Sequence, residues 1–358
     1  SKTLIDHGTT IGFKNGICDA CRLAESKDNN IDWDERQYEL EKLLKKYRSR
    51  NGSYDVIVPG SGGKDSFFVA HQLKYKYDMH PITCTFSPNI YTDWGRKNLD
   101  NWINAGFQNY LFTCNNRIHK LVTRVALEQL LHPFQPWISG QKYFPVKFCK
   151  MTEIPLVIYG ENPAEYGNPN DEYYEDMMTE WHTAVDPDDV FISGIHVDQL
   201  KEKFNLTNAD IEPYKPVSVA EYKKLNIKNV AWSYFTKWHP QENYYYTVEN
   251  SDFQVSTERT SGTYSKYSGI DDKLDDLHFH TAFVKFGMGR TTYDAAQEIR
   301  NRDIDIEEGR SLIKKYDGEY PNRFLDELLS YLSLDPQIYP GISEVFEEPI
   351  IDKEYFDN

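Results

Sequence analysis

The sequence predicts an α/β protein whose core is a doubly wound parallel sheet. Short apolar runs alternate with helical segments between residues 54 and 160, and the first of these runs is followed by a glycine-rich turn and a helix. Strands that alternate with helices form parallel sheets that are covered on both faces. Ligands bind beyond the carboxyl ends of such strands, which is where the glycine-rich turn is expected to lie.

A leader segment, residues 1–50, precedes this core. It has a polar opening that contains Cys18 and Cys21, and then a charged stretch in which apolar side chains return at roughly helical spacing. The core elements follow. Their expected positions are a strand at 55–58, a helix at 65–77, a strand at 81–86, a helix at 96–105, a strand at 110–113, a helix at 118–131 and a strand at 154–159.

Three further regions are expected along the chain. The α/β domain should cover residues 51–200, a mainly helical region residues 201–342, and an acidic tail residues 343–358. Within the first of these, residues 161–189 are strongly acidic and interrupted by prolines. This composition indicates a surface loop or lid and not a strand.

Two helices of the C-terminal region have recognisable limits. Asp305 and Glu308 resemble a capping pair at the start of one helix, and Gly318 is expected to end it. Leucines at positions 325, 328, 329 and 332 then mark the buried stripe of the next helix.

The composition argues against several classes of function. The 358 residues include 56 acidic and 40 basic side chains, a net charge of −16, which disfavours nonspecific binding of nucleic acid through its phosphates. No apolar run approaches the roughly 18 residues of a membrane span, and the first residues lack the features of a secretory signal. We therefore expect a cytoplasmic protein that acts on a small molecule, away from membranes.

Residues 60–66, with the sequence Gly-Ser-Gly-Gly-Lys-Asp-Ser, are the strongest functional feature. A glycine-rich turn between a buried strand and a helix lets successive backbone N–H groups converge on an anion, and the helix dipole adds positive potential. Phosphate is the expected ligand. The spacing is more compact than that of the P-loop of kinases and GTPases, so that class is disfavoured.

The segment 61–66 resembles the Ser-Gly-Gly-x-Asp-Ser loop of the PP-loop ATP pyrophosphatases, which include asparagine synthetases, NAD synthetases and tRNA-modifying enzymes. The resemblance implies their HUP-like α/β fold, cleavage of ATP to AMP and pyrophosphate, and bound Mg²⁺. It implies that Lys64 and Asp65 take part in catalysis, with Asp65 as a magnesium ligand. The residues that it assigns to the nucleotide are Gly60, Ser61, Gly62, Gly63, Lys64, Asp65 and Ser66.

Further motifs narrow this resemblance. They are the segments 16–21 (GICDAC), 31–33 (IDW), 158–162 (IYGEN), 165–167 (EYG), 262–267 (GTYSKY), 270–273 (IDDK) and 285–290 (KFGMGR). With them, nearly the whole chain resembles the N-acetyl sugar amidotransferases of surface-polysaccharide and nonulosonic acid biosynthesis. The C-terminal part especially resembles the members that act in pseudaminic acid synthesis.

That family resemblance implies conversion of a sugar N-acetyl group to an acetamidino group. An amide oxygen is a very poor leaving group, so ATP must first convert it to an O-adenylyl imidate, which ammonia then attacks as AMP leaves. Backbone donors, Lys64 and the metal would stabilise the charge on the phosphates. The substrate would be an acetamido sugar or its nucleotide-linked form.

The source of ammonia is expected to be another protein. A glutaminase domain needs on the order of 100 or more residues, and the predicted domains leave no such length. We therefore expect a separate glutaminase subunit, as the resemblance also implies for some members.

Cys18 and Cys21 form a Cys-x-x-Cys pair, which supplies two of the four ligands of a structural zinc. In the resembling family a second such pair lies shortly before it, so we expect the printed chain to lack a few residues and the two cysteines to bind zinc with them. The alternative is two ordinary thiols. Cys84 and Cys114 are expected to be small core residues, and Cys149 to lie in a loop.

Substrate contacts are expected from two places. Glu161, Asn162 and Glu165 follow a strand and should face the same crevice as the glycine-rich loop, Glu161 as a catalytic group; the alternative is a solvated loop. Lys266, Lys285 and Arg290 could bind a nucleotide-linked or carboxylated sugar, although ordinary salt bridges explain many such residues.

Two other functions remain open. A PP-loop tRNA-modifying enzyme, which transfers sulfur or forms lysidine, is disfavoured by the net charge of −16 and by the absence of a paired catalytic cysteine. A nucleotide-binding scaffold without catalysis is the third possibility.

Overall fold

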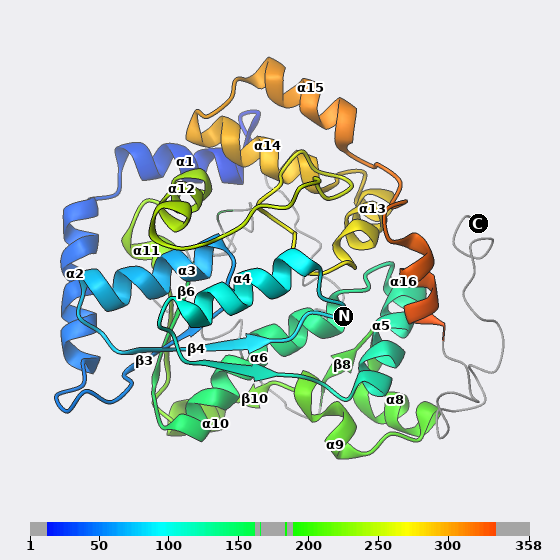
Figure 1. Ribbon diagram of the computed structural model, residues 1–358, viewed down its shortest axis with the longest axis horizontal. Coiled ribbons are helices and arrows are strands. Elements are labelled where there is room, and N and C mark those ends of the chain that lie inside the picture. The colour runs from blue at the N-terminus through cyan, green and yellow to red at the C-terminus, as the bar shows by residue number, and fades with distance from the viewer. Residues whose placement is uncertain (1–12, 162–164, 166–182, 185–188, 334–358) are drawn as a thin grey trace.

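A computed structural model describes residues 13–161, 165, 183–184 and 189–333. Its centre is a five-stranded sheet in the order β11-β6-β3-β4-β5, with every neighbouring pair parallel (Figure 1). The expected α/β architecture with a parallel sheet is therefore confirmed. The strands are β3 (Val56–Pro59), β4 (Pro81–Phe86), β5 (Asn109–Phe112), β6 (Leu156–Tyr159) and β11 (Lys228–Ala231).

Apart from the edge strand β5, both faces of the sheet are buried, and they belong to two separate hydrophobic cores. In β3, Val56 and Val58 belong to one core and Ile57 to the other, because successive side chains of a strand point to opposite faces. Helices on each face complete this doubly wound arrangement. One core includes residues of α2 (Trp33–Tyr47), α3 (Lys64–His71), α4 (Asp93–Asn104) and α11 (Trp232–Phe235), and the other residues of α5 (Asn116–Leu130), α6 (Gln135–Thr152), α8 (Val197–Phe204) and α10 (Val219–Lys224).

The remaining elements flank this core. These elements are β1 (Phe13–Lys14), β2 (Ile17–Cys18), α1 (Asp19–Asn29), η2 (Gln72–Lys76), β7 (Thr183–Ala184), β8 (Phe191–Ile192), β9 (Ile195–His196), α9 (Asn208–Ile211), η5 (Glu212–Tyr214), β10 (Val217–Ser218), α12 (Pro240–Asn250), α13 (Asp275–Phe286), α14 (Arg290–Asn301), α15 (Ile306–Tyr316) and α16 (Leu325–Leu332). Figure 1 shows α14 and α15 on the side of the molecule remote from the strands, with α12 and α13 between them and α4.

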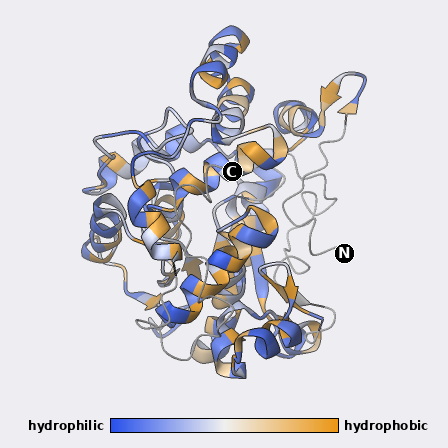
Figure 2. Ribbon diagram, turned by 90° about the vertical axis from the view of Figure 1, so that its right-hand side faces the viewer, coloured by the Kyte–Doolittle hydropathy of each residue, from blue (hydrophilic) through white to orange (hydrophobic). Residues whose placement is uncertain are grey.

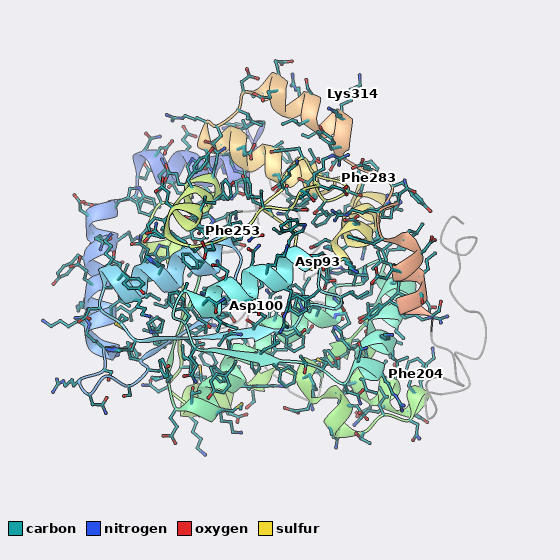
Figure 3. The ribbon with its side chains drawn as sticks, in the orientation of Figure 1. Asp93, Asp100, Phe204, Phe253, Phe283 and Lys314 are labelled. Carbon is teal, nitrogen blue, oxygen red and sulfur yellow. The ribbon has the colours of Figure 1, made fainter. Side chains whose placement is uncertain are left out.

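Most helices are amphipathic, so blue and orange alternate along their ribbons in Figure 2. Side chains such as Phe253 point toward the interior, whereas Lys314 on α15 projects from the periphery (Figure 3). Among the described residues, no helix combines the length and the apolar content that crossing a membrane requires.

The structure differs from the sequence-based expectations at several helices. The helix expected at 65–77 ends at His71 and continues as the π-helical turn η2. Cys149 lies in α6 and not in a loop. The sequence did not predict this 18-residue helix, because Gly140 and Pro145 disfavour a helix at these positions. Gly140 is required there, since a Cβ at this position would lie 2.1 Å from the Phe86 ring.

The capping interpretation at residue 305 is confirmed, because the Asp305 carboxylate accepts a hydrogen bond from Glu308 N–H at 2.8 Å. The leucine stripe of α16 is also confirmed as buried. The sheet itself extends past the expected boundary at residue 200, since β11 comes from residues 228–231. Most of the acidic segment 161–189 and all of the tail 343–358 lie outside the described residues.

Buried His119 on α5 makes the stability of the fold sensitive to acid. Its Nδ1 lies 2.9 Å from the Tyr214 hydroxyl, and burial lowers the pKa of its ring from 6.5 to about 4. The unfolded chain therefore binds a proton that the native state excludes. The stability that depends on the neutral ring is complete above about pH 6.5 and is lost as the pH falls toward 4.

We expect the free energy of unfolding to fall by about 2 kcal/mol less in His119→Phe than in the wild type between about pH 7.5 and pH 5. Phenylalanine keeps the ring but cannot titrate, so this part of the pH dependence disappears. Urea unfolding at the two pH values measures the difference. Parallel pH dependence in both proteins would contradict this account.

Candidate active site

The order of the strands determines where a ligand can enter. β3 is the first strand of the sheet in chain order, and the chain continues to β4 and β5 on one side of it before it returns to β6 on the other. The connections that follow β3 and β6 therefore diverge and leave a crevice at the carboxyl end of the sheet. The glycine-rich loop follows β3, and Gly160 and Glu161 follow β6, so both connections border this crevice.

Two close contacts require glycine in the loop. A Cβ at Gly60 would lie 2.1 Å from Cβ of Ser66, so no side chain fits between the end of β3 and the first turn of α3. Gly62 has a φ of 84°, and a Cβ there would lie 2.6 Å from the carbonyl oxygen of Asn98 on α4. The loop is thus pressed between α3 and α4, and its course is defined by packing.

The backbone of this loop is arranged for an anion. Gly60 N–H donates to the Cys84 carbonyl at 3.0 Å, and Phe67 N–H donates to the Gly63 carbonyl at 3.0 Å. The N–H groups between these two residues belong to the loop and the first turn of α3, where helical partners are lacking. Gly63 is the N-cap residue of α3 and has no side chain to cap it, which leaves that end open to a ligand.

Lys64 and Asp65 are held in place by α12. The Lys64 ammonium forms an ion pair with the Asp65 carboxylate, whose other oxygen accepts from the Asn243 amide at 3.2 Å. The Thr247 hydroxyl, one turn further along α12, donates to the Lys64 carbonyl at 3.0 Å. Neither Asn243 nor Thr247 was predicted as a site residue from the sequence; their i,i+4 spacing, which places them on one face of a helix, was the available signal.

The C-terminal region reaches the loop through Asp271. The side chain of Ser61 donates to the Asp271 carboxylate, and this bond and the charge of Arg290 oppose the rise in the pKa of Asp271 that burial causes. The carbonyl of Asp271 accepts from Thr92 N–H at 3.1 Å, just before α4. Asp271 lies in the segment 270–273, and the sequence alone predicted no binding or catalytic role for it.

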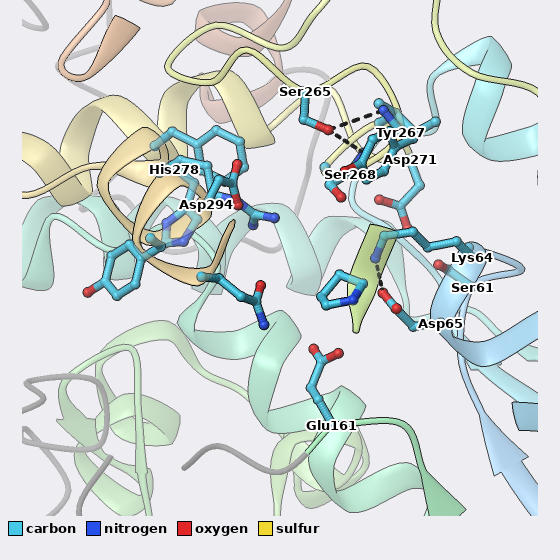
Figure 4. A pocket seen from close by; sticks show the side chains of 18 of the residues that line it. Ser61, Lys64, Asp65, Glu161, Ser265, Tyr267, Ser268, Asp271, His278 and Asp294 are labelled. Carbon is cyan, nitrogen blue, oxygen red and sulfur yellow. Dashed lines mark hydrogen bonds and ion pairs between the residues drawn. The ribbon is translucent and has the colours of Figure 1, made fainter. Parts of the chain in front are cut away.

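These groups border one cavity of about 600 Å³. In Figure 4, Ser61, Lys64 and Asp65 lie on one side of it and His278 and Asp294 on the opposite side, with Glu161 at a third position. The cavity is therefore enclosed by the α/β domain and by the C-terminal helices together. Of the predicted site residues, those that line it are Ser61, Gly63, Lys64, Asp65, Glu161 and Arg290.

Other predicted residues lie elsewhere. The Glu165 carboxylate is buried and pairs with Lys27 of α1 at 2.7 Å, outside the lining of the cavity. Lys266 is exposed and donates to the Thr257 carbonyl at 2.9 Å, and exposed Lys285 donates to the Leu130 carbonyl at 2.7 Å. Asn162 is outside the described residues. Gly60, Gly62 and Ser66 shape the loop without lining the cavity.

Cys18 and Cys21 lie together at the start of α1. Cys18 is the last residue of β2 and the N-cap of the helix, and the two side chains are hydrogen-bonded. Burial and the neighbouring Cys18 raise the pKa of Cys21. Among the residues that the structure describes, no cluster of three or more His, Cys, Asp or Glu side chains suits a metal ion, so further zinc ligands would have to come from outside these residues.

Fold and site together define an α/β protein with a glycine-rich loop at the switch point of its sheet. Residues 261–356 match the family model for the C-terminal domain of WbpG-like LPS biosynthesis proteins, and the structure describes residues 261–333 of this match. No curated protein matches the chain. The matched segment contains Asp271, α13 and α14, so it supplies one wall of the cavity. This similarity agrees with the predicted connection to surface-polysaccharide biosynthesis.

The positive φ of Gly62 and its close approach to Asn98 lead to a matched pair of variants. Gly62→Ala should lose more than about 3 kcal/mol of stability and the binding of pyrophosphate, because the backbone strain adds to the collision with Asn98. Gly52 has a nearly identical φ of 80° but nothing within 4 Å of a Cβ, so Gly52→Ala should lose only about 1 kcal/mol and keep pyrophosphate binding. Urea unfolding and titration calorimetry measure both effects. Equal losses in the two variants would rule out the packing explanation.

Proposed function

We propose that this chain is an ATP-dependent amidotransferase that converts the N-acetyl group of a sugar to an acetamidino group, in nonulosonic acid or surface-polysaccharide biosynthesis. One observation carries the proposal. The cavity that begins at the anion-binding loop ends at helices that match a domain of an LPS biosynthesis family. The glycine-rich loop and a wall with polar groups therefore border one cavity, as the joining of ATP to a sugar amide requires.

The chemistry follows from the groups in the cavity. The amide oxygen of the substrate attacks the α-phosphorus of ATP, pyrophosphate leaves, and an O-adenylyl imidate forms. Ammonia then adds to the imidate carbon, and AMP departs with the former amide oxygen. Backbone N–H groups of the loop and the ammonium of Lys64 stabilise the negative charge of the leaving pyrophosphate. No side chain of the protein needs to act as a nucleophile.

Asp65 and Asp271 fit a role in binding Mg²⁺. Both line the cavity beside the loop, and carboxylate oxygens are the ligands that this ion prefers. Proteins hold Mg²⁺ mainly through one or two carboxylates together with the phosphates of the substrate. Such an ion supplies charge neutralisation to the triphosphate. Glu161, on the opposite connection, is suited to accept a proton from the incoming ammonia.

The thiols disfavour the sulfur-transferring alternative. Burial raises the pKa of Cys149 to about 12 and that of Cys114 to about 11, so neither forms a thiolate readily. Cys84 is fully buried and its pKa is raised as well. A tRNA-thiolating enzyme needs a reactive sulfur carrier, which these three residues do not provide. The ATP requirement also fits a cytoplasmic enzyme, with ammonia delivered by a separate glutaminase subunit.

Incubation with ATP, Mg²⁺, ammonium and candidate acetamido sugars tests the reaction directly. We expect AMP to appear together with a product lighter than the sugar by about one mass unit, because NH replaces oxygen. Lys64→Ala should lower kcat by about 10²- to 10³-fold, and Lys42→Ala, at an exposed position of α2, should not. Glutamine should not replace ammonium without a partner protein. A product heavier by about 16 units would identify sulfur transfer instead.

The cysteine pair is proposed to bind a structural zinc together with ligands outside the described residues. Elemental analysis of the full-length protein should find about one zinc per chain. We expect that zinc to be lost in Cys18→Ser and in Cys21→Ser and retained in Cys114→Ser. Zinc-free wild-type protein of full activity would instead favour two ordinary thiols.

A further inference from the structure

The face that α14 presents to the cavity is unusually polar. Six of its residues line the space, and they recur every three or four positions along the helix, so they form one continuous stripe. They are Arg290, Tyr293, Asp294, Gln297, Glu298 and Asn301. A helix buries an apolar stripe when it serves only the packing of a core, so a polar stripe turned toward a cavity calls for a ligand.

The charged members of this stripe are already engaged within the protein. The Asp294 carboxylate accepts from Arg290 Nε at 2.8 Å and from the Thr263 hydroxyl at 2.7 Å. The Glu298 carboxylate accepts from the Tyr264 hydroxyl at 2.7 Å. These bonds pair Arg290 with Asp294, give the Glu298 carboxylate a neutral donor, and hold the helix against the segment 262–267.

The neutral members are not engaged in this way. Within the described part of the chain, Tyr293, Gln297 and Asn301 form no hydrogen bond through their side chains. They stand at i, i+4 and i+8, so they form a single row of about 12 Å along the helix. A phenol and two carboxamides offer donors and acceptors without net charge. Partly buried groups of this kind gain most when a ligand supplies the missing partners.

We propose that this row of Tyr293, Gln297 and Asn301 binds the neutral, hydroxyl-bearing face of an acetamido sugar and so determines which acceptor is used. The proposal rests on the proposed function, and it narrows the substrate class. Hydroxyl groups both donate and accept, as carboxamides do, and each correct pair contributes modestly to affinity. A site built from such pairs rejects an analogue that leaves its polar groups without partners.

The surroundings disfavour a carboxylated sugar at this row. Lys266 and Lys285, the lysines expected to bind a carboxylate, are outside the lining of the cavity, and Arg290 is held by Asp294. Glu298 and Asp303 line the same end and would repel an anion. The acceptor therefore presents a neutral ring to α14.

Binding of the sugar can be measured apart from catalysis. Saturation-transfer NMR and calorimetry would use N-acetylglucosamine and N-acetylgalactosamine as neutral probes, and N-acetylneuraminic acid as the carboxylated one. We expect Tyr293→Phe, Gln297→Ala and Asn301→Ala each to weaken binding of a neutral probe roughly three- to tenfold. Gln199→Ala provides the matched control, because Gln199 is an exposed carboxamide on α8. Circular dichroism spectra at the binding temperature, and thermal midpoints above it, establish that the variants are folded.

Two results would overturn the proposal. One is unchanged binding of the neutral probes, or none in the wild type; the other is tighter binding of N-acetylneuraminic acid than of both neutral sugars. The amidine assay distinguishes this failure from failure of the proposed function. If AMP and the amidine form at the wild-type rate in Gln297→Ala and Asn301→Ala, the enzyme is an amidotransferase with a different sugar subsite. If the variants lose sugar binding but no amidine forms in the wild type, the subsite stands and the reaction is another.

Discussion

The contact between Gly62 and the backbone of Asn98 is the constraint on which the candidate site depends. It brings the loop so close to α4 that a Cβ would lie 2.6 Å from the Asn98 carbonyl oxygen. The same asparagine uses its side chain differently. Its amide donates to the Gln254 carbonyl and accepts from Gln254 N–H, at 2.9 Å each. Asn98 therefore contacts the glycine-rich loop through its backbone and holds the segment around Gln254 next to it through its side chain.

A second junction completes the cavity. The buried Asp272 carboxylate accepts from Ile90 N–H at 3.1 Å and from the Asn89 amide at 3.0 Å, in the connection that follows β4. Its neighbour Asp271 reaches Ser61. The segment before α13 is thus hydrogen-bonded to the connection that follows β4 and also contacts the glycine-rich loop. Because of these bonds both halves of the described chain contribute walls to the cavity.

Sequence patterns predicted the α/β core and the loop well, and they failed where packing decides. Four strands appear within two residues of their expected positions, because buried parallel strands are short apolar runs. α6 was not predicted because Gly140 and Pro145 interrupt the residue pattern of a helix. Gly140 is needed at its position because a Cβ there would collide with the Phe86 ring. Lys266 and Lys285 were predicted ligands because their positive charge suits a nucleotide-linked or carboxylated sugar. In the structure their ammonium groups donate hydrogen bonds to the backbone carbonyls of Thr257 and Leu130.

Patterns among neighbouring residues therefore predicted one continuous unit of the chain: a strand, the glycine-rich turn and the helix that follows. The glycines, Lys64, Asp65 and Ser66 are adjacent in the chain, so their spacing alone indicated a phosphate site after β3. The opposite wall was beyond such reasoning. Tyr293, Gln297 and Asn301 are ordinary residues on a helix more than 200 positions away. Contacts made by Asn98, Asp271 and Asp272 hold the C-terminal region beside the loop, and the bonds from the segment 262–267 to α14 place that helix on the cavity. Contacts between distant segments, which no local pattern encodes, decided what the loop faces.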